Sequence, residues 1–158
     1  MVMSTNFIRK AVLEDLEDIL YLSSMLFAFH AFDHTLNKEW SFSYEARNLF
    51  LKRINEGFAI VAIEVVSGDV IAYLTGDKYQ APSFRSLEII GEIENIFVVE
   101  KYRNQRVGTK LVEEFLQWCS NGKANNISVR VRPNNTNALN FYRRIGFKYY
   151  TIILERDL

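Results

Sequence analysis

Apolar residues recur at helical spacing in two stretches of the N-terminal part of the chain. From Leu13 to Phe27 they lie three or four residues apart, which is the spacing of one face of an α-helix. A second stretch of the same kind runs from Tyr44 to Ile54. The short mixed segment from Asn6 to Lys10 precedes both and predicts a first strand. We therefore expect one strand followed by two helices.

The middle of the chain has the pattern of strands. Phe58–Val66 is rich in valine, isoleucine and alanine, as in a buried strand, and Ser67-Gly68-Asp69 separates it from a return strand at Val70–Leu74. Gln80–Arg85 contains a proline and predicts a loop. Glu88–Val99 is then the longest strand candidate.

The last third alternates between helix and strand patterns. Apolar residues from Val107 to Cys119 form one stripe of a helix, and Gly122 suits a left-handed cap at its end. Ile127–Val131 alternates like a strand, Ala138–Ile145 predicts a short helix, and Phe147–Leu154 is a final β-rich segment. The whole order predicts an α/β or α+β fold, a mixed sheet with helices packed on it.

Composition fits a single domain over residues 1–158, without a repeat or linker. Nineteen basic residues balance nineteen acidic ones, so nothing draws the whole surface to nucleic acid or to an anionic membrane. The single cysteine, Cys119, excludes an internal disulfide and suits a reducing compartment. Met1–Lys10 lacks the apolar stretch of a signal peptide, and no run reaches the roughly eighteen apolar residues of a membrane span. The expected location is the cytoplasm.

The turn between the longest strand and the next helix suits a phosphate group. It runs from Arg103 to Thr109, and a strand-to-helix turn of this kind presents several unpaired backbone N–H groups in one direction. The helix dipole adds about half a positive charge there. Neither the Walker pattern G-x-x-x-x-G-K-[S/T] nor the dinucleotide pattern G-x-G-x-x-G occurs. On composition alone, a solvated basic helix start explains the segment equally well.

This turn resembles motif A of the GNAT superfamily of N-acetyltransferases, Q/R-x-x-G-x-G/A, which binds the pyrophosphate of coenzyme A. Arg103 takes its first position and Gly108 its last, whereas Arg106 stands where the first glycine belongs. If that position needs a positive φ, an arginine there is strained. If it is merely the first turn of the helix, arginine is acceptable and its charge can reach a phosphate. We favour the second interpretation.

A later segment is similar to the family's N-x-x-A-x-x-x-Y-x-x-x-G-F block, with Asn135 and Tyr142 in its asparagine and tyrosine positions and Gly146-Phe147 at its end. The resemblance spans nearly the whole chain. It implies the acyl-CoA N-acyltransferase fold, with a central, mostly antiparallel sheet flanked by helices, and acetyl-CoA as co-substrate without a metal. The coenzyme-binding residues that it implies are Phe97, Val98, Val99, Arg103, Asn104, Gln105, Arg106, Val107, Gly108, Thr109, Asn135 and Tyr142.

Acetyl transfer to an amine needs a proton acceptor, because an alkyl ammonium has a pKa near 10.4. Glu92 and Glu94 lie two apart in the predicted strand, so both carboxylates share one face, roughly 7 Å apart. Ile96 and Val98 would continue that face and partly desolvate a carboxylate there. By resemblance Glu94 is the first candidate for the base and Glu92 the second, directly or through a water. Two solvated glutamates at an exposed strand end are the competing interpretation.

The resemblance also implies a proton donor and an oxyanion donor. Tyr142 resembles the tyrosine that protonates the coenzyme A sulfur. A helix-face aromatic in the core beside Phe141 is the alternative, and the flanking motif favours the catalytic role. The family has a strand bulge at a position near Val98 and Val99, which would free an N–H for the thioester oxygen.

Aromatic and acidic residues crowd between the first two helices, where family members build much of the acceptor pocket. Phe29, Phe32 and Trp40 together with Asp33 would suit a cationic amine. Packing in the core explains the aromatic residues at least as well.

Two further features are assigned no chemistry. His30 and His34 lie four apart, but no third ligand supports a metal site. Cys119 belongs to the apolar stripe of its helix, so we expect it in the core and not as a nucleophile.

Together these features predict an N-acetyltransferase that moves an acetyl group from acetyl-CoA to a primary amine by direct attack, with a small cationic amine preferred. A protein N-terminus or a lysine is the alternative acceptor. A coenzyme A-binding sensor or regulatory module without turnover is a rival from another class. A nucleic-acid-binding domain is disfavoured by the zero net charge. Homodimers are common among relatives, so a homodimer is a further option by analogy.

Overall fold

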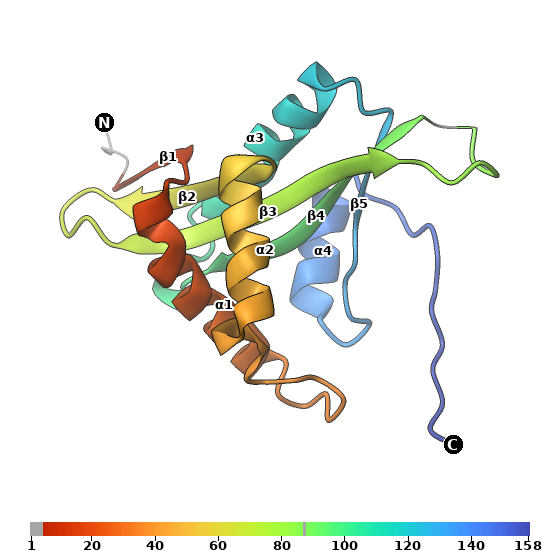
Figure 1. Ribbon diagram of the computed structural model, residues 1–158, viewed down its shortest axis with the longest axis horizontal. Coiled ribbons are helices and arrows are strands. Elements are labelled where there is room, and N and C mark those ends of the chain that lie inside the picture. The colour runs from red at the N-terminus through yellow and green to blue at the C-terminus, as the bar shows by residue number, and fades with distance from the viewer. Residues whose placement is uncertain (1–4, 87) are drawn as a thin grey trace.

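The described residues form a five-stranded sheet in the order β1-β2-β3-β4-β5 (Figure 1). The computed structural model describes residues 5–86 and 88–158. The first four strands pair antiparallel in sequence order, and β5 pairs parallel with β4. The expected mixed, mostly antiparallel sheet is confirmed. Its strands are β1 (Asn6–Lys10), β2 (Phe58–Glu64), β3 (Val70–Gln80), β4 (Ile89–Val98) and β5 (Asn126–Val129).

Helices cover both faces of this sheet (Figure 1). One face carries α1 (Leu16–Phe29) and α2 (Tyr44–Asn55), and the other carries α3 (Val107–Asn121) and α4 (Thr136–Arg144). The four predicted helices are therefore present, within a few residues of their expected bounds. Short 3-10 helices precede three of them: η1 (Leu13–Asp15), η2 (Trp40–Phe42) and η3 (Glu100–Tyr102).

Side-chain alternation along β2 divides the interior into two cores. Ala59 and Val61 belong to the first core, under α1 and α2, whereas Ile60 and Ala62 belong to the second core, under α3 and α4. Because both faces are covered, this strand reads as a continuous apolar run. Cys119 packs in the second core with no exposed surface, as expected, and burial raises the pKa of its thiol to about 11.

An ion pair between a half-exposed arginine and a buried aspartate fixes the entry to the first helix. The two terminal nitrogens of Arg9 in β1 donate to the Asp15 carboxylate at 2.7 and 2.8 Å, and the N–H of Val12 donates to it at 2.8 Å. Asp15 is only 4% exposed. Burial acts against its charged form, but the bonds from Arg9 and Val12 outweigh burial and hold the pKa of Asp15 below its ordinary value.

The end of α3 differs from the expected left-handed glycine cap. Gly122 has a φ of −87°, and Lys123 takes the positive φ, at 59°. A Cβ at Gly122 would meet only the flexible end of the Lys78 side chain, which would have to move. The Lys78 ammonium passes there to lie 3.9 Å from the centre of the Trp118 ring.

The final strand predicted at residues 147–154 is wrong. This segment forms no strand, and it leaves the body of the molecule after α4 and runs along its outer side (Figure 1). Strand propensity alone does not make a strand, because the backbone needs a neighbouring strand to bond with. No backbone hydrogen bond joins residues 148–158 to another part of the described chain.

Candidate active site

The strands β4 and β5 pair at one end and separate at the other. Their pairing stops at Ile93, and β4 continues to Val98 bonded to β3 alone. The N–H of Val99 donates to the carbonyl of Ile71 at 2.9 Å. Since alternate residues of an antiparallel ladder point the same way, the N–H groups of Ile96 and Val98 point away from β3 and into the opening. Val99, one of the two expected oxyanion donors, therefore has its amide occupied.

The bulge in β4 lies at Glu94 and not near Val98 and Val99. Ile93 and Asn95 pair with consecutive residues of β3, so Glu94 is the extra residue of the bulge. The expected position was about four residues too late. Nothing in the sequence marks the extra residue, because it becomes visible only in the pairing with β3.

This bulge reverses the alternation of side chains along β4. Glu94 contacts Arg53 of α2, whereas Ile96 and Val98 pack against the second core on the opposite face. The expectation that Ile96 and Val98 continue the face of Glu94 is therefore wrong. An even spacing keeps two residues on one face only while the strand is regular.

A buried arginine binds both carboxylate oxygens of Glu94. Arg53 is 8% exposed, and its Nε and one terminal nitrogen donate to Glu94 at 2.6 Å each. Its other terminal nitrogen lies 2.8 Å from Asp77 of β3. Glu92 is the cross-strand neighbour of Asp77, so it shares this face, and its closest basic group is Arg130 at 3.4 Å. Glu92 thus makes fewer and longer charge-assisted contacts than Glu94 does.

The turn before α3 holds two non-glycine residues in the left-handed region. Asn104 has a φ of 61° and Arg106 a φ of 63°. The interpretation of Arg106 as an ordinary first helical residue is wrong: Arg106 is the N-cap, and it adopts the conformation for which the family pattern supplies glycine. The backbone shape of the loop is thus maintained at a cost in strain.

The first amides of α3 are available to a ligand. The N–H of Lys110 bonds to the carbonyl of Arg106, so the amides of Val107, Gly108 and Thr109 precede the first helical hydrogen bond. A Cβ at Gly108 would lie 3.6 Å from Phe141, in ordinary contact, so the glycine is not required by the packing of the protein itself.

Other polar residues of the turn hold it in place. Arg103 donates from Nε to the Val98 carbonyl at 2.9 Å, and its guanidinium lies over the rings of Phe29 and Phe97 at 5.6 and 5.5 Å. The Gln105 side chain donates to the Lys101 carbonyl in η3 at 2.9 Å. Arg103 therefore joins three elements at the mouth of the opening: the loop, the end of β4 and the end of α1.

Tyr142 of α4 is buried on the second-core side. It is 5% exposed and packs between the rings of Phe141 and Phe147, at 5.0 and 5.2 Å. Within the described chain its hydroxyl has no hydrogen-bond partner. Burial raises the pKa of this phenol well above its ordinary value, so the group keeps its proton at neutral pH. A buried O–H without a partner is costly, which is a reason to expect a ligand there.

A family model described as the acetyltransferase (GNAT) family matches residues 20–147. The chain belongs to this family. It is 24% identical over 152 residues to an uncharacterized N-acetyltransferase of Methanocaldococcus jannaschii, covering 96% of this chain and 65% of that protein. An N-alpha-acetyltransferase of Sulfurisphaera tokodaii is 25% identical over 109 residues, 66% of this chain and 65% of its own length. The chain thus spans just under two thirds of the length of these curated relatives.

Solved structures confirm the acyltransferase fold. The aminoglycoside acetyltransferase AAC(6')-Iy, in complex with the bisubstrate analog CoA-S-monomethyl-acetylneamine, superposes with a TM-score of 0.72. The alignment covers 98% of this chain and 99% of that one, at 17% sequence identity. A likeness at this identity establishes the GNAT fold and leaves the acceptor to be argued from this chain's own residues.

The GNAT block around Asn135 has a structural role in this chain. The Asn135 side-chain oxygen accepts from the Ala138 N–H at 3.1 Å and so caps α4. Its side-chain amide nitrogen remains for another acceptor. Upstream, Arg132 forms an ion pair with Asp33, which ties the segment after β5 to the loop after α1.

The residues expected in the acceptor pocket separate into two groups. Phe29 and Phe32 are 48% and 57% exposed, and both rings meet His30 edge to face, at 5.3 and 5.9 Å. Trp40 instead stacks on Phe27 at 5.2 Å and packs against the first core.

The structure gives His30 and Arg53 surroundings that the sequence did not predict. Burial, and then Arg132, lower the pKa of His30, so its ring is neutral at pH 7, and its buried Nδ1 has no hydrogen-bond partner in the described residues. Arg53 carried no signal in the sequence, because only the packing of α2 on β4 brings it to Glu94. His34 is exposed and lies 3.9 Å from Asp157, and the described chain contains no cluster of three or more metal-binding side chains.

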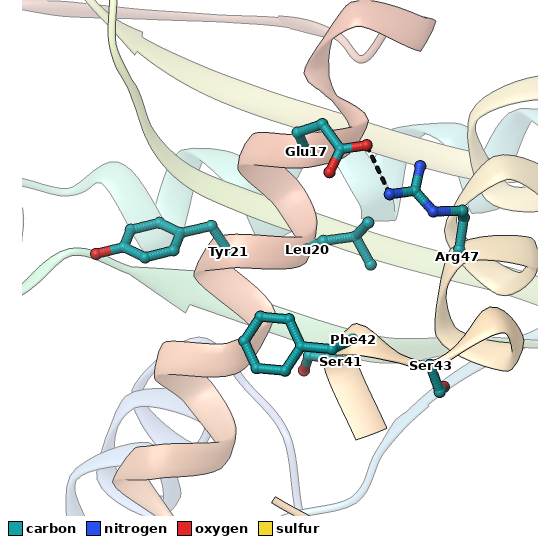
Figure 2. Close-up of a pocket in the computed structure, with 7 residues that line it drawn as sticks. All are labelled: Glu17, Leu20, Tyr21, Ser41, Phe42, Ser43 and Arg47. Atoms are coloured by element: carbon teal, nitrogen blue, oxygen red, sulfur yellow. Dashed lines mark ion pairs between the residues drawn. The ribbon is translucent and has the colours of Figure 1, made fainter. Parts of the chain in front are cut away.

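A hollow of about 230 Å³ lies between α1 and the start of α2 (Figure 2). Glu17 and Arg47 form an ion pair at 2.7 Å across it. None of the residues that line it comes from the sheet or from α3, so it lies apart from the β4–β5 opening. In the part of the chain that the structure describes, no helix is both long and apolar enough to cross a bilayer.

Proposed function

We propose that this chain is an acetyl-CoA-dependent N-acetyltransferase acting on a primary amine. The observation that carries the proposal is the open edge of β4, which leads directly into the turn before α3. A thioester bound along this edge meets the N–H groups of Ile96 and Val98, and its phosphates meet the amides at the start of α3. Membership in the GNAT family supports the same assignment.

The turn before α3 fits the pyrophosphate of coenzyme A. Two left-handed positions, Asn104 and Arg106, shape the turn, and the amides of Val107, Gly108 and Thr109 follow directly with no helical acceptor. Arg103, Arg106 and Lys110 add positive charge there. The buried, unpartnered hydroxyl of Tyr142 fits the other end of the cofactor, where a sulfur would accept its hydrogen bond.

The reaction follows from these positions. The free amine attacks the acetyl carbon, a C–N bond forms and the C–S bond breaks, while a β4 N–H stabilises the developing negative charge on oxygen. Tyr142 donates its hydroxyl hydrogen to the departing thiolate, and the phenolate then regains a proton from solvent; burial, which raises the pKa of this phenol, favours the return to the neutral form. The proton lost by the amine passes to a carboxylate or through water to solvent.

For that proton we rank Glu92 before Glu94. Glu94 is held by two 2.6 Å bonds from Arg53, so it acts as a positioning residue that fixes the bulge in β4. Glu92 has one longer contact, with Arg130 at 3.4 Å. Protonating Glu92 therefore breaks fewer charge-assisted bonds than protonating Glu94.

A small cationic amine remains the preferred acceptor. The exposed rings of Phe29 and Phe32 beside Asp33 suit a cation at the end of α1. A protein N-terminus is the second candidate, favoured by the likeness to the N-alpha-acetyltransferase of Sulfurisphaera tokodaii. A coenzyme A-binding regulatory module would bind the cofactor without turnover.

The test joins cofactor binding to turnover. At a concentration 100-fold above its Kd, acetyl-CoA should stabilise the chain by about 2.7 kcal/mol and raise Tm by about 5–10 °C. Tyr142→Phe should keep this shift and lower kcat about 100-fold on the best substrate of an amine panel. Tyr79→Phe, at a half-exposed position of β3, is the matched control and should change neither.

Two results would refute the assignment. If acetyl-CoA does not raise Tm, the proposed cofactor site is wrong, and so are the catalytic roles that depend on it. If acetyl-CoA raises Tm but no amine or peptide is acetylated, the chain is instead a coenzyme A-binding regulatory module. Glu92→Gln should lower kcat and leave the free energy of unfolding unchanged. Glu94→Gln should mainly lower the free energy of unfolding, because it removes the carboxylate that pairs with the buried Arg53 guanidinium.

A further inference from the structure

His30, at the end of α1, has a buried nitrogen that makes no hydrogen bond. The ring as a whole is partly exposed, but its Nδ1 is buried and has no partner among the described residues. A buried polar atom without a hydrogen bond is costly, which is a reason to expect a ligand that completes its bonding. The reaction steps of the proposed function give this histidine no part.

The end of α1 lies beside the end of β4. The ring of Phe29 meets His30 edge to face at 5.3 Å, and it lies 5.6 Å from the Arg103 guanidinium. The same guanidinium lies 5.5 Å from the ring of Phe97, and its Nε donates to the carbonyl of Val98. His30 is therefore close to the β4 side of the opening between β4 and β5.

The other side of the opening also reaches His30. Arg132 lies three residues beyond the end of β5 and forms an ion pair with Asp33, in the loop after α1. Its charge is near enough to His30 to lower the pKa of the ring. Val131 packs against the second core, so Arg132, the next residue of the extended chain, faces the α1 side. His30 thus lies across the opening, between the diverging ends of β4 and β5.

Tyr142 and His30 reach this opening from opposite faces of the sheet. Tyr142 belongs to the second core, whereas His30 ends a helix that covers the first core. When the coenzyme sulfur lies at the Tyr142 hydroxyl, the acetyl carbon lies between the two residues. An amine that comes from the exposed rings of Phe29 and Phe32 then meets His30 before it reaches the acetyl carbon.

We propose that His30 binds the attacking amine, with Nδ1 accepting a hydrogen bond from an amine N–H. This inference rests on the proposed function. A neutral primary amine has two N–H groups and a lone pair, so one N–H donates to Nδ1 while the lone pair attacks the acetyl carbon. The C–N bond forms, the C–S bond breaks, and the sulfur receives the hydroxyl hydrogen of Tyr142. The proton that the new amide nitrogen releases passes to Glu92 or through water to solvent, so His30 orients the amine and keeps no proton.

The surroundings of His30 keep its ring neutral, as this role requires. An imidazolium has two donors and no acceptor, whereas the neutral tautomer with its hydrogen on Nε2 has a lone pair on Nδ1. Burial, and then the positive charge of Arg132, lower the pKa of His30, and the opposing effect of Asp33 is smaller. The rings of Phe29 and Phe32 flank the imidazole at 5.3 and 5.9 Å without offering it a hydrogen-bond partner.

Three substitutions of His30 test this role. His30→Asn brings an amide oxygen to the place of Nδ1 and should keep kcat/KM for the best amine within about 3-fold of the unmodified chain. His30→Gln brings its amide to the place of Nε2, and His30→Phe has no acceptor, so both should lower kcat/KM about 30-fold. His34→Asn, at an exposed position in the loop after α1, is the control and should change nothing. Acetyl-CoA should raise Tm equally in all four variants.

The comparison of His30→Asn with His30→Gln decides the proposal even if His30→Phe does not fold, because these two side chains differ by one methylene group. Equal kcat/KM in the two polar variants, or a folded His30→Phe variant as active as the unmodified chain, would overturn the role of His30 and leave the acetyltransferase assignment intact. An unmodified chain that acetylates no amine would overturn both. A loss confined to His30→Gln and His30→Phe supports the proposal.

Discussion

At the scale of single residues, Arg106 keeps the backbone conformation of the family's turn although it replaces the usual glycine. Its φ of 63° is the conformation that glycine adopts freely, and a β-carbon there costs about 1–2 kcal/mol. The guanidinium that comes with this cost adds charge at the start of α3. We infer that Arg106 lowers the free energy of unfolding but provides a guanidinium that can reach a phosphate.

Arg106→Gly should therefore raise the free energy of unfolding by about 1 kcal/mol, because it relieves the left-handed strain. Arg106→Ala loses the same charge and keeps the strain, so its stability should stay near that of the unmodified chain. Both should bind acetyl-CoA more weakly, as measured by calorimetry, alongside urea unfolding for stability. Equal stability of the two variants would show that the strain argument is wrong.

At the scale of elements, the bulge in β4 decides which side chains meet. The extra residue at Glu94 sends the glutamates toward α2 and Ile96 toward α3. Arg53 then gives the bulge a fixed partner. The entry to α1 is organised in the same way, since Arg9 on β1 and Asp15 before the helix fix the angle between strand and helix.

The Arg9–Asp15 pair predicts a pH dependence. Because the folded-state pKa of Asp15 is lowered, its contribution is complete above the unfolded value of about 3.9 and is lost as pH falls through the folded value. Acidification from pH 5 to below pH 3 should cost about 1 kcal/mol through this group.

Asp15→Asn should remove that loss and should be less stable than the unmodified chain at pH 7, by urea unfolding. Glu17→Gln, at the more exposed pair with Arg47, is the control and should change stability by less than about 0.5 kcal/mol. If Asp15→Asn still loses the full amount of stability on acidification, other carboxylates are responsible for that loss.

At the scale of the whole molecule, one sheet supports two cores and the site lies where the sheet opens. The helix pairs α1–α2 and α3–α4 never need to touch, because β2, β3 and β4 contribute alternate side chains to each core. Besides the shared strands, two side-chain contacts connect the acceptor side to the cofactor side: Arg103 lies over Phe29 at the end of α1, and Arg132 forms an ion pair with Asp33.

The shared sheet predicts a single unfolding transition. Phe50→Ala in the first core and Phe115→Ala in the second should each cost about 3–5 kcal/mol, since both side chains are fully buried. Both variants should still unfold in one step by calorimetry, with matching circular dichroism. A two-step curve in either variant would mean that the two cores are separate folding units.

The sequence by itself determined the elements and the family. Apolar periodicity and turn residues located the four helices and the hairpin, because these patterns arise from local geometry, and the short mixed segment at the N-terminus was expected as the first strand. The motifs around Gly108 and Tyr142 were sufficient to predict the acyltransferase fold, which the family match and the solved structures confirm.

The tertiary structure decided what depends on pairing between distant segments. The bulge at Glu94 is defined by the pairing of β4 with β3. The hydrogen bonds from Arg53 to Glu94 form because α2 packs on β4. The positive φ of Arg106 is a property of the folded turn before α3. Residues 147–154 have strand composition but no neighbouring strand in the described chain, so composition alone predicted a strand that the fold does not form. A strand needs a hydrogen-bonded neighbour from a distant part of the chain or from another molecule, and a local sequence pattern does not show whether that neighbour is present.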